Sequence, residues 1–235
     1  MNNVCEEHFL SLNTRFGEII TLSFNSKHEP LLSTLFQFVD DLTLWQSMLE
    51  CHADTTILVS AIKEYELGFQ AAVCGQYRYA FIAQRYFIEQ ICRFIYLSTN
   101  ELHLRHWKLG LRDVSWGALT DKENGIFSKI FIRAFYPEID DEGDRVLSIV
   151  SKLYREASEF VHGNFDKMKV IPSQIEFNLE MLLKWLEFME TSKFVALFLL
   201  FMRFSKDIDK ANIHKFEDMA RDELLGIEGF NLLFL

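Results

Sequence analysis

A cation and an imidazole lie two helical turns apart near the end of one expected helix. Within residues 151–164, Arg155 and His162 are seven positions apart, so a helix of about 3.6 residues per turn projects them to nearly the same side. Arginine binds phosphate oxygens through a planar guanidinium, and histidine exchanges a proton near neutral pH. The pair therefore suits phosphate chemistry, in which one group binds the anion and the other moves a proton.

Two further polar residues complete a stripe between them, and a glycine ends it. Ser158 and Glu159 follow Arg155 at i+3 and i+4, and Gly163 is a helix stop signal. A purely structural interpretation remains open, in which Arg155 forms an i,i+4 ion pair with Glu159 and His162 interacts with the negative end of the helix dipole.

An upstream apolar helix carries a second charged pair. Arg85 and Glu89 stand at i,i+4 among residues 79–95, whose apolar side chains indicate a central helix. They form either a structural ion pair at the edge of the bundle or a support that faces Arg155 and His162 and orients them.

These two segments together resemble a known superfamily. Residues 154–163, YREASEFVHG, resemble the arginine-x(4–6)-histidine signature of the HEPN superfamily, and residues 80–96, AFIAQRYFIEQICRFIY, resemble its earlier core helix. The resemblance covers about residues 69–166 and implies a helical bundle with a HEPN-like core. Many HEPN domains are metal-independent ribonucleases of toxin–antitoxin, abortive-infection and CRISPR-linked systems, and others are non-catalytic binding modules.

The resemblance also implies roles for single residues. In such enzymes two protomers bring their motifs to a shared cleft, which here would contain Arg155 to polarise the scissile phosphate and His162 to transfer a proton during attack by the RNA 2′-OH. The product would be a cyclic phosphate, formed without a metal or another cofactor. Ser158 and Asn164 would hold the phosphate or the imidazole.

Composition favours helices and argues against some partners. The 235 residues are 49% hydrophobic with 23 Phe, but contain only 10 Gly and 3 Pro, which argues against a β-sandwich or barrel. The net charge of −10 argues against a dedicated DNA-coating protein. Residues 78–112 nevertheless have an excess of cations, which either form a local basic face or are scattered in solvent. These cations are Arg78, Arg85, Arg93, Arg105, Lys108 and Arg112.

No targeting or membrane segment is visible. The four cysteines show no metal-binding spacing and indicate free thiols in a reducing compartment. The longest apolar run, residues 194–202, is far too short to cross a bilayer. We expect a cytoplasmic protein without membrane contact.

The order of elements follows from apolar periodicity and stop signals. We expect an all-α bundle of about six to eight helices, in three segments: an arm and first helix at 1–52, a HEPN-like bundle at 53–205, and a C-terminal helix and docked tail at 206–235. Within the arm, residues 16–24 alternate as a short strand or an irregular segment. Gly68 and Gly75 are the expected breaks in residues 55–97. The central helices are expected at about 76–98, 122–135, 143–162 and 173–204, the last capped by Ser173.

Three functions remain open. The first is a HEPN-like endoribonuclease of prokaryotic antiviral defence or a toxin–antitoxin system, acting on RNA as a homodimer. The second is a non-catalytic HEPN-like interaction module that binds a partner protein in a larger complex, favoured by the acidic charge and by Glu156, because active members often have Asn, Asp or His after the arginine. The third is an acidic antitoxin or immunity-type protein, to which the acidic loop at 139–144 points.

Overall fold

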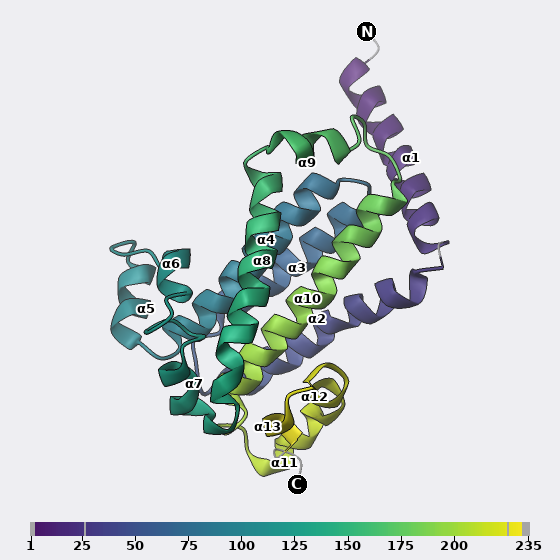
Figure 1. Ribbon diagram of the computed structural model, residues 1–235. Coiled ribbons are helices and arrows are strands. Elements are labelled where there is room, and N and C mark those ends of the chain that lie inside the picture. The colour runs from purple at the N-terminus through teal and green to yellow at the C-terminus, as the bar shows by residue number, and fades with distance from the viewer. Residues whose placement is uncertain (1–2, 26, 225, 232–235) are drawn as a thin grey trace.

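The computed structural model describes residues 3–25, 27–224 and 226–231, and every regular element in these ranges is a helix (Figure 1). The expected all-α class is confirmed. More helices form than the six to eight expected, because short helical turns occupy several connections. The elements are α1 (Val4–Phe24), α2 (Glu29–Leu49), α3 (Thr56–Val73), α4 (Tyr77–Leu97), α5 (Glu101–Lys108), α6 (Trp116–Leu119), α7 (Lys129–Phe135), η1 (Pro137–Glu142), α8 (Gly143–Val161), α9 (Phe165–Val170), α10 (Leu179–Phe204), α11 (Lys210–Ile213), η2 (His214–Phe216), α12 (Glu217–Leu224) and α13 (Glu228–Asn231).

Helix α4 lies at the centre of the bundle, between α3, α8 and α10 (Figure 1). Its Phe81 ring stacks on Phe160 of α8 with ring centres 4.1 Å apart and meets Phe188 of α10 edge-on at 5.1 Å. A hydrogen bond also crosses this core. The buried Gln84 side-chain amide donates to the hydroxyl of Ser192 on α10 at 2.8 Å. These contacts fix α8, and with it the focal polar stripe, against α4.

Gly68 does not break the chain, contrary to the sequence expectation. It lies inside α3, where a β-carbon would meet the Ala80 carbonyl oxygen and the Ala83 β-carbon at 3.4 Å. A β-carbon would make only ordinary van der Waals contacts there, so the packing of α3 along α4, rather than a need for glycine, outweighs the low helix propensity of this residue. The break occurs at Gly75, whose φ of +76° closes the α3–α4 turn.

The expected strand or irregular arm at residues 16–24 is wrong. Residues 4–24 form α1, whose first turn is capped by Asn3, and the apparent alternation of residues 16–24 is part of a helical apolar stripe. Figure 1 shows α1 running along the upper edge of the bundle and extending beyond it.

Two helices start later than expected because a better cap lies downstream. Ser128 caps α7 by accepting the Phe131 amide at 3.2 Å, so the helix begins at Lys129 rather than 122. Asn178, not Ser173, caps α10 by accepting the Met181 amide at 3.0 Å. In both cases a side-chain oxygen satisfies an otherwise orphaned first-turn N–H.

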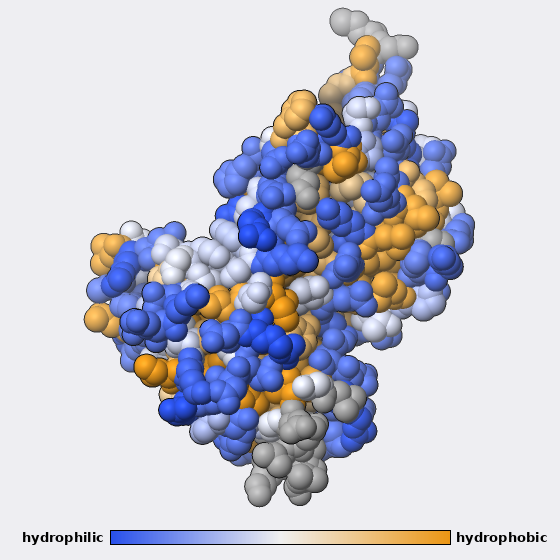
Figure 2. Space-filling view, viewed as in Figure 1, coloured by the Kyte–Doolittle hydropathy of each residue, from blue (hydrophilic) through white to orange (hydrophobic). Residues whose placement is uncertain are grey.

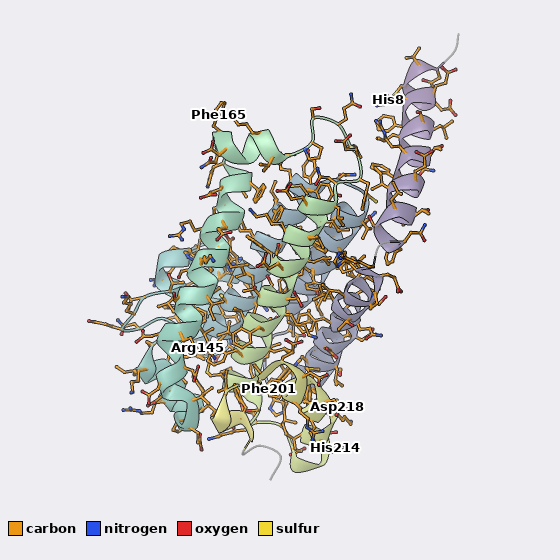
Figure 3. The ribbon with its side chains drawn as sticks, turned by 45° about the vertical axis from the view of Figure 1, so that its right-hand side comes forward. His8, Arg145, Phe165, Phe201, His214 and Asp218 are labelled. Carbon is orange, nitrogen blue, oxygen red and sulfur yellow. The ribbon has the colours of Figure 1, made fainter. Side chains whose placement is uncertain are left out.

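The C-terminal elements pack on the end of the bundle. Phe230 is buried against Tyr136, Phe198 and Phe201, and the Tyr136 hydroxyl donates to the Gly229 carbonyl at 3.0 Å. Figure 3 shows Phe201 on the part of α10 next to these elements. Residues 232–235 of the expected tail lie outside the described residues.

Two further expectations concern the cysteines and membrane-spanning helices. All four cysteines are free thiols, with Cys5 and Cys51 exposed and Cys74 and Cys92 buried. In the described ranges, no helix has the length and apolar content to span a membrane.

Candidate active site at the end of α8

The polar stripe lies on the last two turns of α8, and the helix ends where the sequence indicates. His162 is the C-cap residue and Gly163 follows with a φ of +67°. The Asn164 amide then donates back to the Glu159 carbonyl at 3.0 Å, a 6→1 bond typical of a glycine-terminated helix. The end of α8 is therefore a well-defined platform for the side chains before it.

Arg155 and His162 are both exposed on this platform. Seven residues separate them by about 10 Å along the axis and about 20° around it. Side chains on a helix lean towards its N-terminus, so the imidazole leans towards Arg155. Among the residues that the structure describes, neither side chain has a hydrogen-bond or ion-pair partner. Arg155 therefore does not form the ion pair with Glu159 that the structural interpretation expects.

Ser158 and Asn164 have structural partners of their own. The half-buried Ser158 hydroxyl donates to the Tyr154 carbonyl at 2.6 Å, which satisfies its proton within α8. The Asn164 side-chain oxygen accepts the Asp166 amide at 3.0 Å and so supports the first turn of α9. Both can still bind a ligand. Ser158 can accept a hydrogen bond through the lone pairs of its hydroxyl oxygen, and Asn164 can donate one through its side-chain NH2 group.

Arg85 and Glu89 face α8 but contact a neighbouring residue rather than the pair. The Arg85 guanidinium binds Glu89 at 3.0 Å and the Tyr154 hydroxyl at 2.6 Å, and its carbon lies 4.6 Å from the centre of the Tyr154 ring. The same ring stacks on Trp116, with ring centres 3.8 Å apart. Burial, and then the Glu89 charge, raise the pKa of the Tyr154 hydroxyl. This Arg85–Tyr154 clamp fixes α8 one residue before Arg155.

Glu156, the residue after the motif arginine, points to a different side. It is half-buried, lies 3.9 Å from Lys152, and lines a pocket of about 630 Å3 between α8 and α10. Its carboxylate therefore does not neutralise Arg155.

A further arginine, Arg78, reaches this helix end from α4. The exposed Arg78 donates to the Val161 carbonyl, the residue before His162, at 3.4 Å. A cation there interacts favourably with the negative end of the α8 dipole. Sequence reasoning counted Arg78 only as part of a basic stretch, because nothing in the sequence pairs the start of α4 with the end of α8.

The rest of the basic stretch is mostly neutralised locally. Arg93 bonds to Gln90 and lies 4.0 Å from Asp113, Arg105 pairs with Glu101, and Lys108 pairs with Asp54. Since Arg85 pairs with Glu89, these cations do not form a continuous basic face.

The acidic loop is neutralised in the same way. Asp140 pairs with Arg133 at 2.6 Å, Asp141 with Lys129, Glu138 with Lys206 at 2.7 Å, and Glu142 with Arg145 at 2.6 Å. Nearby cations thus pair with most of the carboxylates that an acidic masking protein would need to present, although Asp144 is exposed.

A pocket of about 510 Å3 adjoins the end of α8. It lies between α3, α4 and the last turn of α8, and the exposed Tyr86 ring forms one wall. Burial raises the pKa of the Glu64 carboxyl in this wall. The other lining residues are Ile82, Arg85, Glu89 and Val161.

Metal ligands do not gather in the described part of the chain: no three His, Cys, Asp or Glu side chains there are placed to hold an ion. Comparisons with family models, with curated proteins and with solved structures find no match. The HEPN resemblance consequently rests on residues 80–96 and 154–163 alone.

Proposed function

We propose that this chain is a HEPN-like, metal-independent endoribonuclease with Arg155 and His162 as its catalytic residues. The observation that carries the proposal is that both side chains are exposed on one face of the end of α8 without a partner among the described residues. An arginine that served only the fold would be expected to pair with a nearby carboxylate, and Glu156 and Glu159 lie within about one turn of Arg155 on α8.

The chemistry assigns one role to each group. Arg155 binds two non-bridging oxygens of the scissile phosphate and stabilises the charge that develops on them. His162 accepts the proton of the ribose 2′-OH as its oxygen attacks phosphorus. The bond to the 5′ oxygen breaks, and that oxygen leaves with a proton from an acid, which in a homodimer is the protonated histidine of the second copy. The products are a 2′,3′-cyclic phosphate and a 5′-OH.

The surroundings offer places for the rest of a short RNA strand. Arg78 retains donors beyond its single bond to Val161 and suits a flanking phosphate. The exposed Tyr86 ring in the 510 Å3 pocket suits stacking of one unpaired base. Because the net charge is −10, we expect the substrate to be a short or locally single-stranded segment rather than a long duplex.

The test is cleavage of a mixed-sequence RNA in EDTA by wild type and two single variants. General acid–base catalysis contributes about 10²–10⁴-fold, so His162→Ala should lower the rate by that amount, and Arg155→Ala should do the same or more. Ser148→Ala is the matched control, because Ser148 is exposed on the same face of α8 two turns before Arg155. Equal residual cleavage by wild type and His162→Ala contradicts the proposal.

The second candidate is a non-catalytic interaction module within a larger complex. The observation that favours it is the internal pairing of most cations in residues 78–112, which limits the surface available to RNA. It expects no cleavage by pure protein, with Arg155→Ala changing capture of a partner protein instead. Wild-type cleavage that is lost in His162→Ala rejects it.

A further inference from the structure

Helix α1 carries an apolar stripe of which only one end is covered. The stripe residues recur at alternating spacings of four and three, a pattern suited to helix pairing. They are Cys5, Phe9, Leu12, Phe16 and Ile19, and the polar Ser23 continues the same face. Ile19 and Ser23 are buried on the body, where the Ser23 hydroxyl donates to the Val73 carbonyl at 3.3 Å, and Phe16 is half-buried.

The other end of the stripe extends past the bundle. Phe9 is 60% exposed, and its neighbours Val4 and Leu10 are exposed as well. Figure 3 shows this half of α1, which includes His8, projecting beyond the other helices. Residues 4–11, about 12 Å of helix, are all exposed, whereas Leu12 on the same stripe is half-buried. Phe9 thus continues the packing stripe beyond the part that the body covers.

Further apolar side chains surround the base of α1. Figure 2 shows them gathered where α1 meets α2. Here a groove of about 850 Å3 includes Phe24, Phe36 and Leu67 in its walls. Of the 17 large apolar side chains exposed in the described ranges, eight lie on α1 or beside it on α2 and α3. At about half exposure the eight together contribute roughly 700 Å2 of apolar surface, although not on one face, because Leu10 lies on the same side of α1 as Thr14.

We propose that the projecting half of α1 pairs in antiparallel orientation with α1 of a second copy of this chain. One surface supplies both halves of the contact, a projecting helix and an apolar groove at its base, and a two-fold dimer requires such self-complementarity. In the antiparallel arrangement the first turn of each α1 lies towards the base of the other, so the same contact covers the stripe and part of the groove.

The charges on α1 select this orientation. Glu6 and Glu7 make the first turn acidic, and Arg15 lies eight residues after Glu7. The base carries charges of both signs, with Glu18 on α1 and Lys63 and Glu66 in the groove. Antiparallel pairing places each acidic turn near Arg15 of the second copy. Parallel pairing would instead place the two acidic turns beside each other, which is unfavourable.

The test is sedimentation equilibrium of the full chain at several concentrations. Wild type should show a monomer–dimer equilibrium, and Phe9→Glu should weaken dimerisation by about tenfold or more. Because Phe9 is exposed in the monomer, this change leaves the core intact. Thr14→Glu is the control, since Thr14 is exposed on the opposite side of the same helix. A wild type that stays monomeric, or a Phe9→Glu variant that dimerises normally, overturns the proposal.

A charge exchange tests the orientation. Arg15→Glu alone should weaken the dimer, and adding Glu6→Lys and Glu7→Lys should restore it, because the opposite charges again face each other. Failure of the combined variant to recover contradicts antiparallel pairing. Neither readout involves RNA, so the α1 contact is measured separately from cleavage. A Phe9→Glu variant that dimerises normally overturns the α1 contact and leaves the proposed cleavage standing, whereas a monomeric wild type also removes the second histidine that the proposed cleavage uses.

Discussion

The contact between Arg85 and Tyr154 predicts a measurable energetic coupling between α4 and α8. The Arg85 guanidinium, 20% exposed, donates to the Tyr154 hydroxyl at 2.6 Å and lies over the Tyr154 ring. A hydrogen bond to a charged group contributes about 1.5–3 kcal/mol where it is shielded from water. Tyr154→Phe removes this bond but keeps the ring that stacks on Trp116. We therefore expect it to lower the free energy of unfolding by about 1–2 kcal/mol, because the site is only partly buried.

A double-mutant cycle isolates the contact from its surroundings. Urea unfolding of wild type, Arg85→Met, Tyr154→Phe and the double variant should give a coupling energy of about 1–2 kcal/mol. The matched control replaces Arg85→Met by Arg105→Met. Arg105 pairs with Glu101 on α5 and does not contact Tyr154, so its effect should add to that of Tyr154→Phe within about 0.5 kcal/mol.

Additive effects of the two substitutions would contradict a coupling between α4 and α8. If Arg85→Met and Tyr154→Phe are additive within the error seen for the control pair, the clamp does not connect α4 to α8. The last turns of α8 would then be positioned by the Phe81–Phe160 stack and by the bond from Arg78 to the Val161 carbonyl.

Three further changes give expectations for stability, each measured by urea unfolding. Gly163→Ala places a β-carbon at a φ of +67° and should lower the free energy of unfolding by about 1–2 kcal/mol. Gly17→Ala, in an open helix interior, should raise it by up to about 1 kcal/mol. Equal effects of the two changes would contradict the assignment of Gly163 as a helix stop. Phe160→Ala empties a fully buried ring position against Phe81 and should cost about 3–5 kcal/mol; a cost below about 1 kcal/mol would place Phe160 outside the core. Burial raises the pKa of Asp41 above its usual 3.8, so its contribution to stability is present at low pH and is lost as pH rises through the folded-state pKa. Asp41→Asn should therefore stabilise the protein at pH 7, with a gain that shrinks towards about pH 4; a gain independent of pH would exclude titration as its cause.

Local signals in the sequence were sufficient for much of the fold. The Gly163 stop, the span of α4 and the extent of α8 follow from apolar periodicity and from a residue that tolerates positive φ. The errors have tertiary causes. Gly68 continues a helix because α4 packs closely against it, and a helix start moves from Ser173 to Asn178 because only the latter satisfies the first turn of α10.

The candidate site could likewise be predicted only in part from the sequence. Helical period alone places Arg155 and His162 on one side, and the structure has both exposed. The Arg85–Tyr154 clamp, its stack on Trp116 and the approach of Arg78 to Val161 join segments up to 83 residues apart in sequence. No spacing rule connects such segments, so these supports were visible only in the fold.

We propose that Arg155 and His162 together cleave RNA through attack by the 2′-OH. A chimeric oligonucleotide with one ribonucleotide in a DNA strand, incubated in EDTA with wild type and with His162→Ala, tests this directly. We expect wild type to cleave after the ribonucleotide and to leave a 2′,3′-cyclic phosphate, the all-DNA strand to remain uncut, and His162→Ala to be slower by about 10²-fold or more. Cleavage of the all-DNA strand, or equal cleavage by wild type and His162→Ala, would contradict this proposal.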